Sequence, residues 1–512
     1  MKRKNRWLLS LLTIATSLAL LLSACSSGSN DTNAKKSQPE ASGTNAEKGN
    51  AETKDPYEID MAILTFKDVP KDLPMIQDEI NKITKSKINT TVKITVIPAG
   101  NWQQQTNLML NSNAKLDMLI TSGFWGYSVQ AAKGQLYPMG KLLDKYGKGI
   151  KEAMEPQILN ATKINGEVYG VPTVRDFAAS YGFVMRKDLV DKYKIDVGAI
   201  KSYDDLEKTL KIIKDNEPAI TPVVSTGTIM RSPNVDLLSD SLGVLMNMDN
   251  LKVENLYETS EYANNVKKMR KWYQEGYLLK DAATNQIAAA KLVQSGKGFG
   301  YFTVMKPGIA EQESRTVGTE MVTAEINPPT STTANITNFM WSIYNNSKNP
   351  ERTMMFLNML YSDKELVNLI DWGIEGKHYV KTPDGQIDYA PGVDVTNSGY
   401  VPNWDWLTGN QFISSIFKGN DPEIWNKMKA FNKEARKSKA LGFTFNAENI
   451  KTEYTALNNV LGQYQNGLGT GTLDPDKNLP DFISKLKAAG IDKVIAEKQK
   501  QLDEWVKVNN IK

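Results

Sequence analysis

The stretch that decides the fold runs from Glu58 to Ile120, and three apolar segments mark it: EIDMAILTF (Glu58–Phe66), TVKITVI (Thr91–Ile97) and KLDMLI (Lys115–Ile120). Each segment is short, rich in β-branched or aliphatic residues and bounded by turn-forming or polar residues, which is typical of a strand. Apolar residues at three- and four-residue steps predict a helix over Lys71–Thr84, and a second helix is expected over Trp102–Asn111. This strand–helix alternation predicts a parallel sheet covered by helices, so the fold class is α/β.

The same alternation continues toward the C-terminus and predicts a second α/β unit. A strand is expected over Met321–Ile326, and Asn327-Pro328-Pro329 is expected to end it because proline donates no ladder hydrogen bond. Ser202 is expected to cap a helix over Tyr203–Lys214. The other expected strands and helices of this part are Val168–Pro172, Ala179–Met185, Arg186–Tyr193, Thr221–Val224, Tyr262–Tyr277, Ile287–Ser295, Gly298–Val304, Phe339–Tyr344, Glu351–Ser362, Lys364–Trp372 and a largely helical tail from Asp421.

The first 25 residues have the composition of a bacterial lipoprotein signal. Four basic residues precede an apolar run over Trp7–Leu22, which leads into Leu22-Ser23-Ala24-Cys25. We predict that residues 1–24 are removed and that Cys25 carries a lipid anchor. Residues 25–56 contain no aromatic side chain and are expected to form a disordered tether. The mature chain is thus expected on the extracellular face of a Gram-positive cell membrane.

Composition excludes several classes of function for the mature chain. Cys25 is the only cysteine, so the folded part has no disulfide and no thiol nucleophile. Removing the four basic signal residues from 62 leaves 58 against 58 acidic ones, so no bulk charge favours nucleic acid. His378 is the only histidine, which argues against a histidine metal site. We expect no catalytic residues, no metal, no cofactor and no nucleic acid, and we expect a monomer.

Several segments occur in an order that resembles a known family. They are Asp117–Ile120 with its glycine–aromatic exit, GEVYGVP (Gly166–Pro172), YGFVMRKDLVDK (Tyr181–Lys192), GKGFGYF (Gly296–Phe302), GIEGKHY (Gly373–Tyr379), and in the tail Glu448–Val460, Gly467–Pro475 and Phe482–Trp505. With the lipobox, this set resembles family 1 of the extracellular solute-binding proteins of ABC sugar importers, in the LipO-type lipoprotein subgroup that carries a C-terminal extension.

The resemblance implies a two-lobe, maltose-binding-like fold of type II, with a mostly parallel sheet in each lobe and a ligand cleft between the lobes. It implies an N-lobe of residues 57–173 and 332–375 and a C-lobe of residues 174–331 and 376–512, the latter including the helical extension. The chain would cross between lobes near Thr173–Phe177, Asn327–Thr333 and Trp372–Gly376. The expected ligand is an oligosaccharide, and the expected partners are ABC permease subunits in the membrane.

Candidate ligand-binding residues follow from the position of aromatic and planar polar side chains. They are Phe124, Trp125, Arg175, Asp176, Tyr181, Asn327, Trp372, Glu375, Trp404 and Trp406. A sugar offers hydroxyl edges and apolar C–H faces, so flat rings beside hydrogen-bonding groups suit it. The alternatives are lobe packing for the aromatic residues, a hinge salt bridge for Arg175 and Asp176, and a surface turn for Glu375.

Two other functions remain open at this level. Carboxylates are abundant enough to supply a glycosidase pair, so a surface-anchored polysaccharide-degrading enzyme is one alternative. A peptide-binding lipoprotein is the other, and its site would depend on backbone pairing more than on exposed rings.

Overall fold

The computed structural model describes residues 53–112 and 114–511, so the signal, Cys25 and most of the tether lie outside the described residues.

The first sheet contains the three parallel strands that were predicted. The strand order is β2 (Thr90–Pro98), β1 (Tyr57–Thr65), β3 (Met118–Thr121), β13 (Met340–Ile343) and β6 (Val171–Pro172). Strands β2, β1 and β3 run parallel, whereas β13 runs antiparallel to both of its neighbours. The carboxyl ends of β1, β2, β3 and β6 therefore meet the amino end of β13 at one edge.

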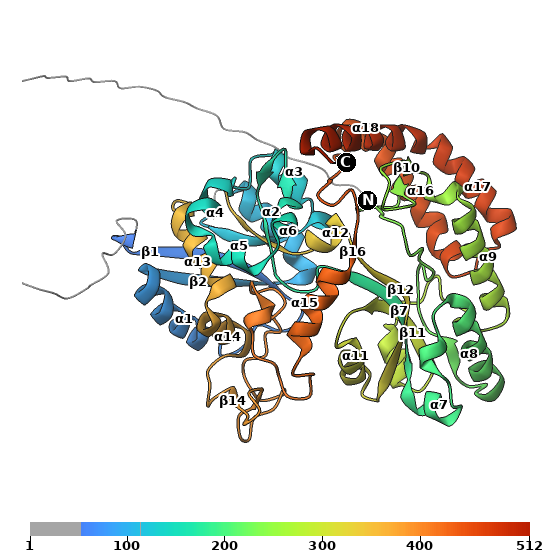
Figure 1. Ribbon diagram of the computed structural model, residues 1–512, viewed down its shortest axis with the longest axis horizontal. Helices are drawn as coiled ribbons and strands as arrows, with labels where there is room; N and C mark the ends of the chain where they lie inside the picture. Colours follow the sequence, from blue (N-terminus) through green and yellow to red (C-terminus); the bar gives the residue numbers. More distant parts are fainter. Residues whose placement is uncertain (1–52, 113, 512) are drawn as a thin grey trace, which may run out of the picture. The chain divides into compact units, whose positions relative to one another are not determined.

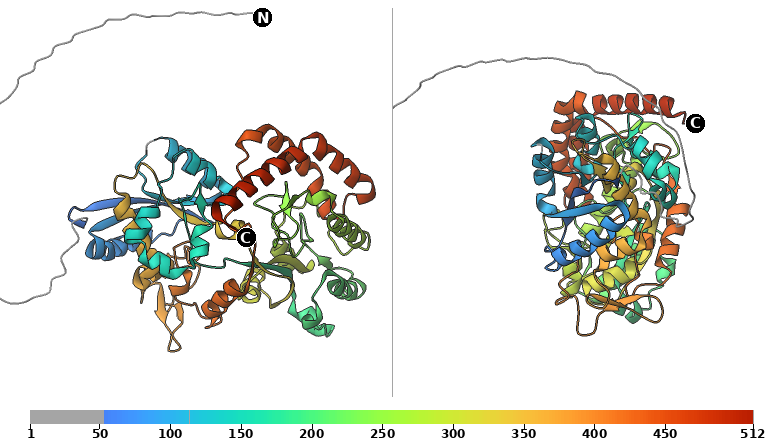
Figure 2. Two further views of the ribbon diagram at one scale, coloured as in Figure 1. Left: turned by 45° about the horizontal axis from the view of Figure 1, so that its top comes forward. Right: turned by 90° about the vertical axis from the view of Figure 1, so that its left-hand side faces the viewer.

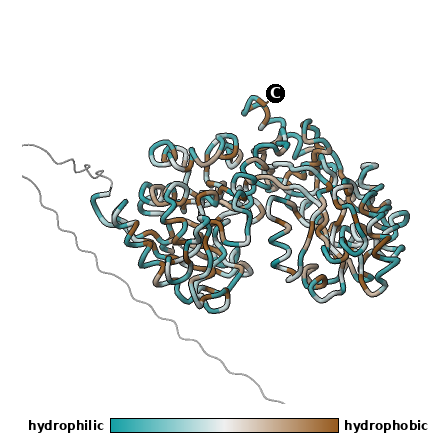
Figure 3. The backbone as a smooth tube through the Cα atoms, turned by 60° about the horizontal axis from the view of Figure 1, so that its bottom comes forward, coloured by the Kyte–Doolittle hydropathy of each residue, from teal (hydrophilic) through white to brown (hydrophobic). Residues whose placement is uncertain are grey.

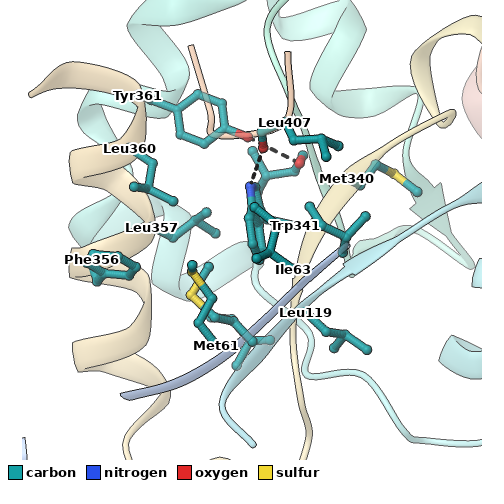
Figure 4. Close-up of a cluster of buried hydrophobic side chains, with 14 of the residues drawn as sticks. Met61, Ile63, Leu119, Met340, Trp341, Phe356, Leu357, Leu360, Tyr361 and Leu407 are labelled. Atoms are coloured by element: carbon teal, nitrogen blue, oxygen red, sulfur yellow. Dashed lines mark hydrogen bonds between the residues drawn. The ribbon is translucent and has the colours of Figure 1, made fainter. Parts of the chain in front are cut away.

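Helices cover this sheet and bury its apolar side chains. They include α1 (Leu73–Ile88), α2 (Trp102–Asn111), α13 (Pro350–Ser362) and α14 (Lys364–Trp372). Figure 4 shows the centre of this core, where the fully buried Trp341 of β13 lies beside side chains of α13. The indole Nε1 of Trp341 donates to the carbonyls of Leu407 at 2.9 Å and Thr408 at 3.1 Å, so this buried N–H has acceptors.

Those two acceptors belong to a segment that sequence analysis assigned to the other lobe. Residues 379–417 begin with a hairpin of β14 (Tyr379–Lys381) and β15 (Ile387–Tyr389). Beyond the hairpin, Tyr400, Trp404 and Leu407 are buried in the core of the first sheet. The boundary expected at residue 375, with a crossing near Trp372–Gly376, is therefore wrong: these apolar side chains and the Trp341 contact hold the segment on the first lobe.

The second sheet is also mixed. Its order is β16 (Arg436–Lys437), β12 (Met321–Ser331), β7 (Ala179–Arg186), β11 (Gly298–Met305) and β8 (Thr221–Val223). Strand β12 continues through Pro328 and Pro329, so these prolines do not end it as expected. The register of β12 against β7 shifts on either side of Asn327, and at such bulges the missing proline N–H removes no regular ladder bond.

Helices of the second lobe flank this sheet and accept the C-terminal helices. They are α7 (Lys187–Lys192), α8 (Tyr203–Asn216), α9 (Ser260–Gln274), α10 (Ala289–Gln294) and α11 (Ile309–Val317). Ser202 caps α8 as expected, by accepting a bond from the N–H of Asp205. Helices α16 (Lys451–Gly469), α17 (Pro475–Ala488) and α18 (Ile491–Asn509) form the red end of the chain beside α9 (Figures 1 and 2) and share a core with it.

Three segments join the lobes: residues 173–178, residues 331–339, and α15 (Ile424–Glu434) leading into β16. The side-chain amide of Asn432 in α15 ties two of them together, donating to the carbonyl of Arg175 at 2.6 Å and accepting from the N–H of Phe177 at 2.8 Å.

The other short elements are η2 (Ala99–Asn101), η3 (Gly123–Trp125), α3 (Tyr127–Ala132), α4 (Gly140–Tyr146), α5 (Lys148–Ala153), α6 (Pro156–Asn160), β4 (Lys163–Ile164), β5 (Glu167–Val168), η4 (Val197–Ala199), β9 (Val244–Leu245), β10 (Val253–Glu254), η5 (Leu256–Glu258), α12 (Thr333–Ile336), η6 (Gln411–Ile413) and η7 (Glu448–Ile450).

The two-lobe α/β fold class is thus confirmed. The expectation of a mostly parallel sheet in each lobe is wrong, because each five-stranded sheet of the described residues has two parallel and two antiparallel strand pairings. Figure 3 shows hydrophobic and hydrophilic residues interleaved along the helices. Within residues 53–112 and 114–511, none of the helices combines the length and apolar character needed to cross a bilayer.

Candidate functional site

Five aromatic side chains gather where the strands of the first sheet meet at their common edge. We call them the aromatic edge: Phe66, Phe124, Trp125, Phe339 and Trp406. Phe66 directly follows β1, Phe124 and Trp125 follow β3, and Phe339 precedes the antiparallel β13. Trp406 comes from the segment that packs on this lobe. Ligands of α/β sheets bind at this edge, outside the carboxyl ends of the strands.

The rings of the aromatic edge contact one another in a continuous series. Centroid distances are 4.7 Å for Phe124–Trp125, 5.7 Å for Trp125–Phe339, 4.9 Å for Phe339–Trp406 and 6.0 Å for Phe66–Trp406. Phe66 and Phe124 are nevertheless 65 % and 60 % exposed. Exposing apolar rings to water is unfavourable, so covering a group of them with the apolar face of a ligand gains free energy.

The backbone that presents Phe124 and Trp125 is fixed from both sides. The N–H of Gly123 donates to the carbonyl of Thr337 at 2.8 Å, and a Cβ at Gly123 would lie 2.6 Å from the Thr337 hydroxyl. Gly126 then turns the chain with a φ of +86°, which glycine adopts without strain. These two glycines account for the ring positions at the end of β3.

Arg175 adds a cation to the aromatic edge. Its guanidinium carbon lies 5.8 Å from the ring centre of Phe339 and 5.5 Å from that of Trp406, within cation–π range. Arg175 also pairs with Asp176 at 3.2 Å, and Asp176 pairs with Lys306 at the end of β11, also at 3.2 Å. The two interpretations of this pair are thus compatible, since Arg175 faces the rings while Asp176 bridges to the second lobe.

A second group, the polar cluster, lies at one end of the second sheet. It consists of Tyr181, Tyr203, Arg231 and Asn327. The guanidinium of Arg231 lies 4.2 Å from the ring centre of Tyr181, while its backbone carbonyl accepts from Asn327 at 2.9 Å and from the Tyr203 hydroxyl at 3.1 Å. Burial raises the pKa of Tyr181 to about 12, so its hydroxyl stays protonated and donates to the carbonyl of Ile229. Arg231 is the exposed member of this cluster.

The other candidates lie away from both groups. Trp404 is 1 % exposed and its indole N–H donates to the carbonyl of Leu64 at 3.0 Å, which makes it a core residue. Trp372 packs against Phe417 and donates to Ser414. Glu375 is exposed and pairs with Lys381 at 2.7 Å, in agreement with the surface-turn alternative. For Trp404 the ligand-binding prediction is wrong, because a fully buried ring offers no face to a ligand.

The titratable side chains of the described residues form no metal-binding group. Within residues 53–112 and 114–511, no group of three or more histidine, cysteine or acidic side chains is placed to hold a metal ion. His378 is buried, accepts from the N–H of Ile374 and contacts Asp72 at 3.1 Å, which is a structural arrangement.

Sequence reasoning missed Phe66, Phe339, Arg231 and Tyr203. Phe66 could have been found by the rule that selected Phe124, because it ends a predicted strand. Finding Phe339 would have required knowing that β13 runs antiparallel to its neighbours, which places its amino end at this edge. The sequence does not show the direction of a strand in a sheet. Arg231 lies in a long connection between β8 and β9 without periodic apolar residues, so no signal marked it.

Comparison with known proteins assigns this architecture to a family. The family described as bacterial extracellular solute-binding protein matches residues 72–366, and a domain of unknown function, DUF3502, matches residues 439–507. A carbohydrate ABC transporter substrate-binding protein of Streptococcus pneumoniae is 31 % identical over 86 % of this chain and 89 % of its own length. Lipoprotein LipO of Bacillus subtilis is 25 % identical over 46 % of this chain and 47 % of its own.

Among solved structures, the N-glycan transport solute-binding protein NgtS of Streptococcus pneumoniae is 30 % identical, covers 88 % of this chain and 99 % of its own, and superposes with a TM-score of 0.80. Its complex with Man5GlcNAc gives a TM-score of 0.68 at 29 % identity, over 88 % of this chain and 99 % of its own. Both the length of the family match and the identity to a full-length relative support one conclusion: the chain belongs to the bacterial extracellular solute-binding protein family.

Proposed function

We propose that this protein captures an oligosaccharide outside the cell, with sugar rings stacked on the aromatic edge, and delivers it to an ABC permease in the membrane. The observation that carries the proposal is the continuous series of rings that runs from the exposed Phe124 through the half-buried Trp125, Phe339 and Trp406, with Arg175 beside them. The polar cluster supplies groups that bind hydroxyls. The similarity to NgtS, an N-glycan transport solute-binding protein with a structure in complex with Man5GlcNAc, favours a ligand that contains mannose and N-acetylglucosamine.

The direct test is calorimetric titration of the mature chain with Man5GlcNAc and with a panel of other neutral and acidic oligosaccharides. Binding at micromolar concentration or tighter, worth about 8 kcal/mol or more, is expected for at least one of them. Trp125→Ala should weaken that binding by about 2 kcal/mol through loss of ring stacking. Trp372→Ala is the matched control, since Trp372 is half-buried and packs outside the aromatic edge. Equal losses in the two variants would contradict the assignment of the site.

The same titration separates a receptor from an enzyme. We expect the oligosaccharide to be recovered intact after long incubation, with no new reducing ends and no unsaturated products. Turnover in the wild type would overturn the receptor assignment, and substitutions of paired carboxylates would then locate the active site.

We further propose that Cys25 carries the lipid that holds the receptor at the membrane, in line with the lipobox and with the similarity to LipO. Cys25→Ala should move the protein from the membrane fraction to the medium while leaving oligosaccharide affinity unchanged. A membrane-bound Cys25→Ala protein would rule out the lipid on Cys25 as the anchor.

A further inference from the structure

The loop that carries Arg231 is held by the C-terminal helices rather than by its own strands. Residues 224–243 connect β8 to β9, and we call them the Arg231 loop. At the start of this loop, the Tyr181 hydroxyl donates to the carbonyl of Ile229 at 2.9 Å, and Asn327 donates to the carbonyl of Arg231 at 2.9 Å. These two bonds couple the loop backbone to the polar cluster.

The far end of the Arg231 loop is fixed by α16 and α18. The ammonium of Lys498 contacts Asp240 at 2.8 Å and donates to the carbonyl of Gly243 at 3.0 Å. The Tyr454 hydroxyl donates to the other oxygen of Asp240, also at 2.8 Å. At Gly469 the backbone of α16 approaches the loop so closely that a Cβ would lie 2.9 Å from the Cα of Thr228.

Lys498 is an unusual residue for such a contact because its side chain is fully buried. Burial lowers the pKa of Lys498, while Asp240 and, more weakly, Asp236 oppose that shift. A buried lysine persists only where its charge is paired and its N–H groups have acceptors, and here Asp240 and Gly243 provide both.

The backbone of the Arg231 loop also needs external support. Leu238 and Ser239 have φ values of +48° and +77°, in the left-handed region that residues with a Cβ rarely adopt. Such conformations persist only where the surroundings impose them. Leu238 is 5 % exposed and shares a small core with Leu502 of α18, so the extension supplies part of that constraint.

We propose that the C-terminal extension acts as a positioning element for the binding site, in which Lys498 and Tyr454 fix the Arg231 loop so that Arg231 is held toward the ligand. This inference rests on the proposed function for its ligand, and it gives a role to the segment matched by the domain of unknown function. Lys498 is a positioning residue, since it acts through Asp240 and the loop.

The test uses the full mature chain and the variant Lys498→Met, which keeps an unbranched side chain one atom shorter and removes its charge. Hydrogen–deuterium exchange of peptides covering the Arg231 loop should rise by about tenfold, because the loop loses its anchor. Affinity for Man5GlcNAc should fall by about tenfold. Lys500→Met, on an exposed position of the same helix, is the matched control and should change neither measurement.

A double-mutant cycle distinguishes positioning from general destabilisation. In the Arg231→Met background, Lys498→Met should change affinity by less than about twofold, because the residue that it positions is already absent. An equal affinity loss in both backgrounds, or unchanged exchange in the Arg231 loop of a folded Lys498→Met protein, would overturn the inference. If Lys498→Met does not fold, Tyr454→Phe removes one loop contact at constant shape and is judged by the same two criteria.

The exchange measurement needs no ligand, so the two proposals fail separately. A wild type that binds no oligosaccharide refutes the proposed function and with it the role of Arg231 toward a ligand. Exchange that rises only in the Arg231 loop of Lys498→Met would still show that the extension fixes that loop.

Discussion

The two candidate binding surfaces, one on each lobe, differ in their chemistry and in the ionisable group that is buried behind them. The aromatic edge of the first lobe offers ring faces and one cation, whereas the polar cluster of the second lobe offers the guanidinium of Arg231 held over a buried phenol. Behind the first surface, the buried Asp371 accepts bonds from Thr408 and Ser414, in the segment that carries Trp406. Behind the second, the buried Lys498 pairs with Asp240. Sugars have both apolar faces and hydroxyl edges, so two unlike surfaces suit such a ligand better than two similar ones.

The largest effect should separate stability from binding within the first lobe. Trp404→Ala empties a fully buried site and removes the bond to Leu64, so we expect a loss of about 3–5 kcal/mol in the free energy of unfolding. Trp406→Ala removes a half-buried ring of the aromatic edge, so it should cost far less stability and weaken oligosaccharide binding instead. Urea unfolding and calorimetry on both variants provide the comparison. A Trp404→Ala protein with wild-type stability would contradict the assignment of this residue to the core.

A second effect, smaller per unit of pH, should appear as a pH dependence of the stability of the first lobe. Burial, and then the nearby charge of Asp405, raise the pKa of Asp371 to about 8. An unfolded aspartate titrates near 4, so between about pH 4 and pH 8 the folded state holds the extra proton, and stability falls with rising pH by about 1.4 kcal/mol per unit. The dependence levels off above pH 8 and below pH 4.

Asp371→Asn should remove this contribution, because an amide does not titrate. The variant should therefore gain stability relative to the wild type as pH rises from 5 to 8, measured by urea unfolding at several pH values. A constant difference between the two proteins across that range would show that Asp371 is ionised in the folded state. Glu375→Gln, at an exposed position, is the matched control and should shift stability little at any pH.

Elements that depend on a local sequence pattern were predicted closely, whereas the location of segments that depend on distant contacts was not. Helices α2 and α14 have the predicted bounds, and the strand expected at Ala179–Met185 is extended by one residue, because apolar periodicity and caps act over a few residues. The location of residues 379–417 depends on Trp341 and Leu64 finding partners far along the chain, which no local pattern encodes.

The site shows the same limit at finer scale. Trp404 and Trp406 are two residues apart in one loop, and sequence treats them alike, yet one points into the core and the other joins the aromatic edge. Phe124 and Trp125 lie at the end of a strand as the sequence predicted, because that position depends on one short segment only. The loop that carries Arg231 contacts C-terminal helices far along the chain, with Asp240 and Lys498 258 residues apart, a relation that sequence alone does not reveal.

The smallest expected effect concerns the second surface and decides whether it binds ligand at all. Arg231→Met removes the guanidinium above the Tyr181 ring but leaves the backbone carbonyl for Asn327, so the fold should be retained. It removes the exposed donors, and one charged hydrogen bond to a hydroxyl is worth about 1.5 kcal/mol, or about tenfold in affinity for Man5GlcNAc. Arg186→Met, on the same sheet but paired with Asp188, serves as the control. A guanidinium that binds the ligand cannot be removed without a loss of affinity. Unchanged affinity in Arg231→Met would therefore leave the aromatic edge as the binding surface of the two. The polar cluster would then serve the packing of the second lobe.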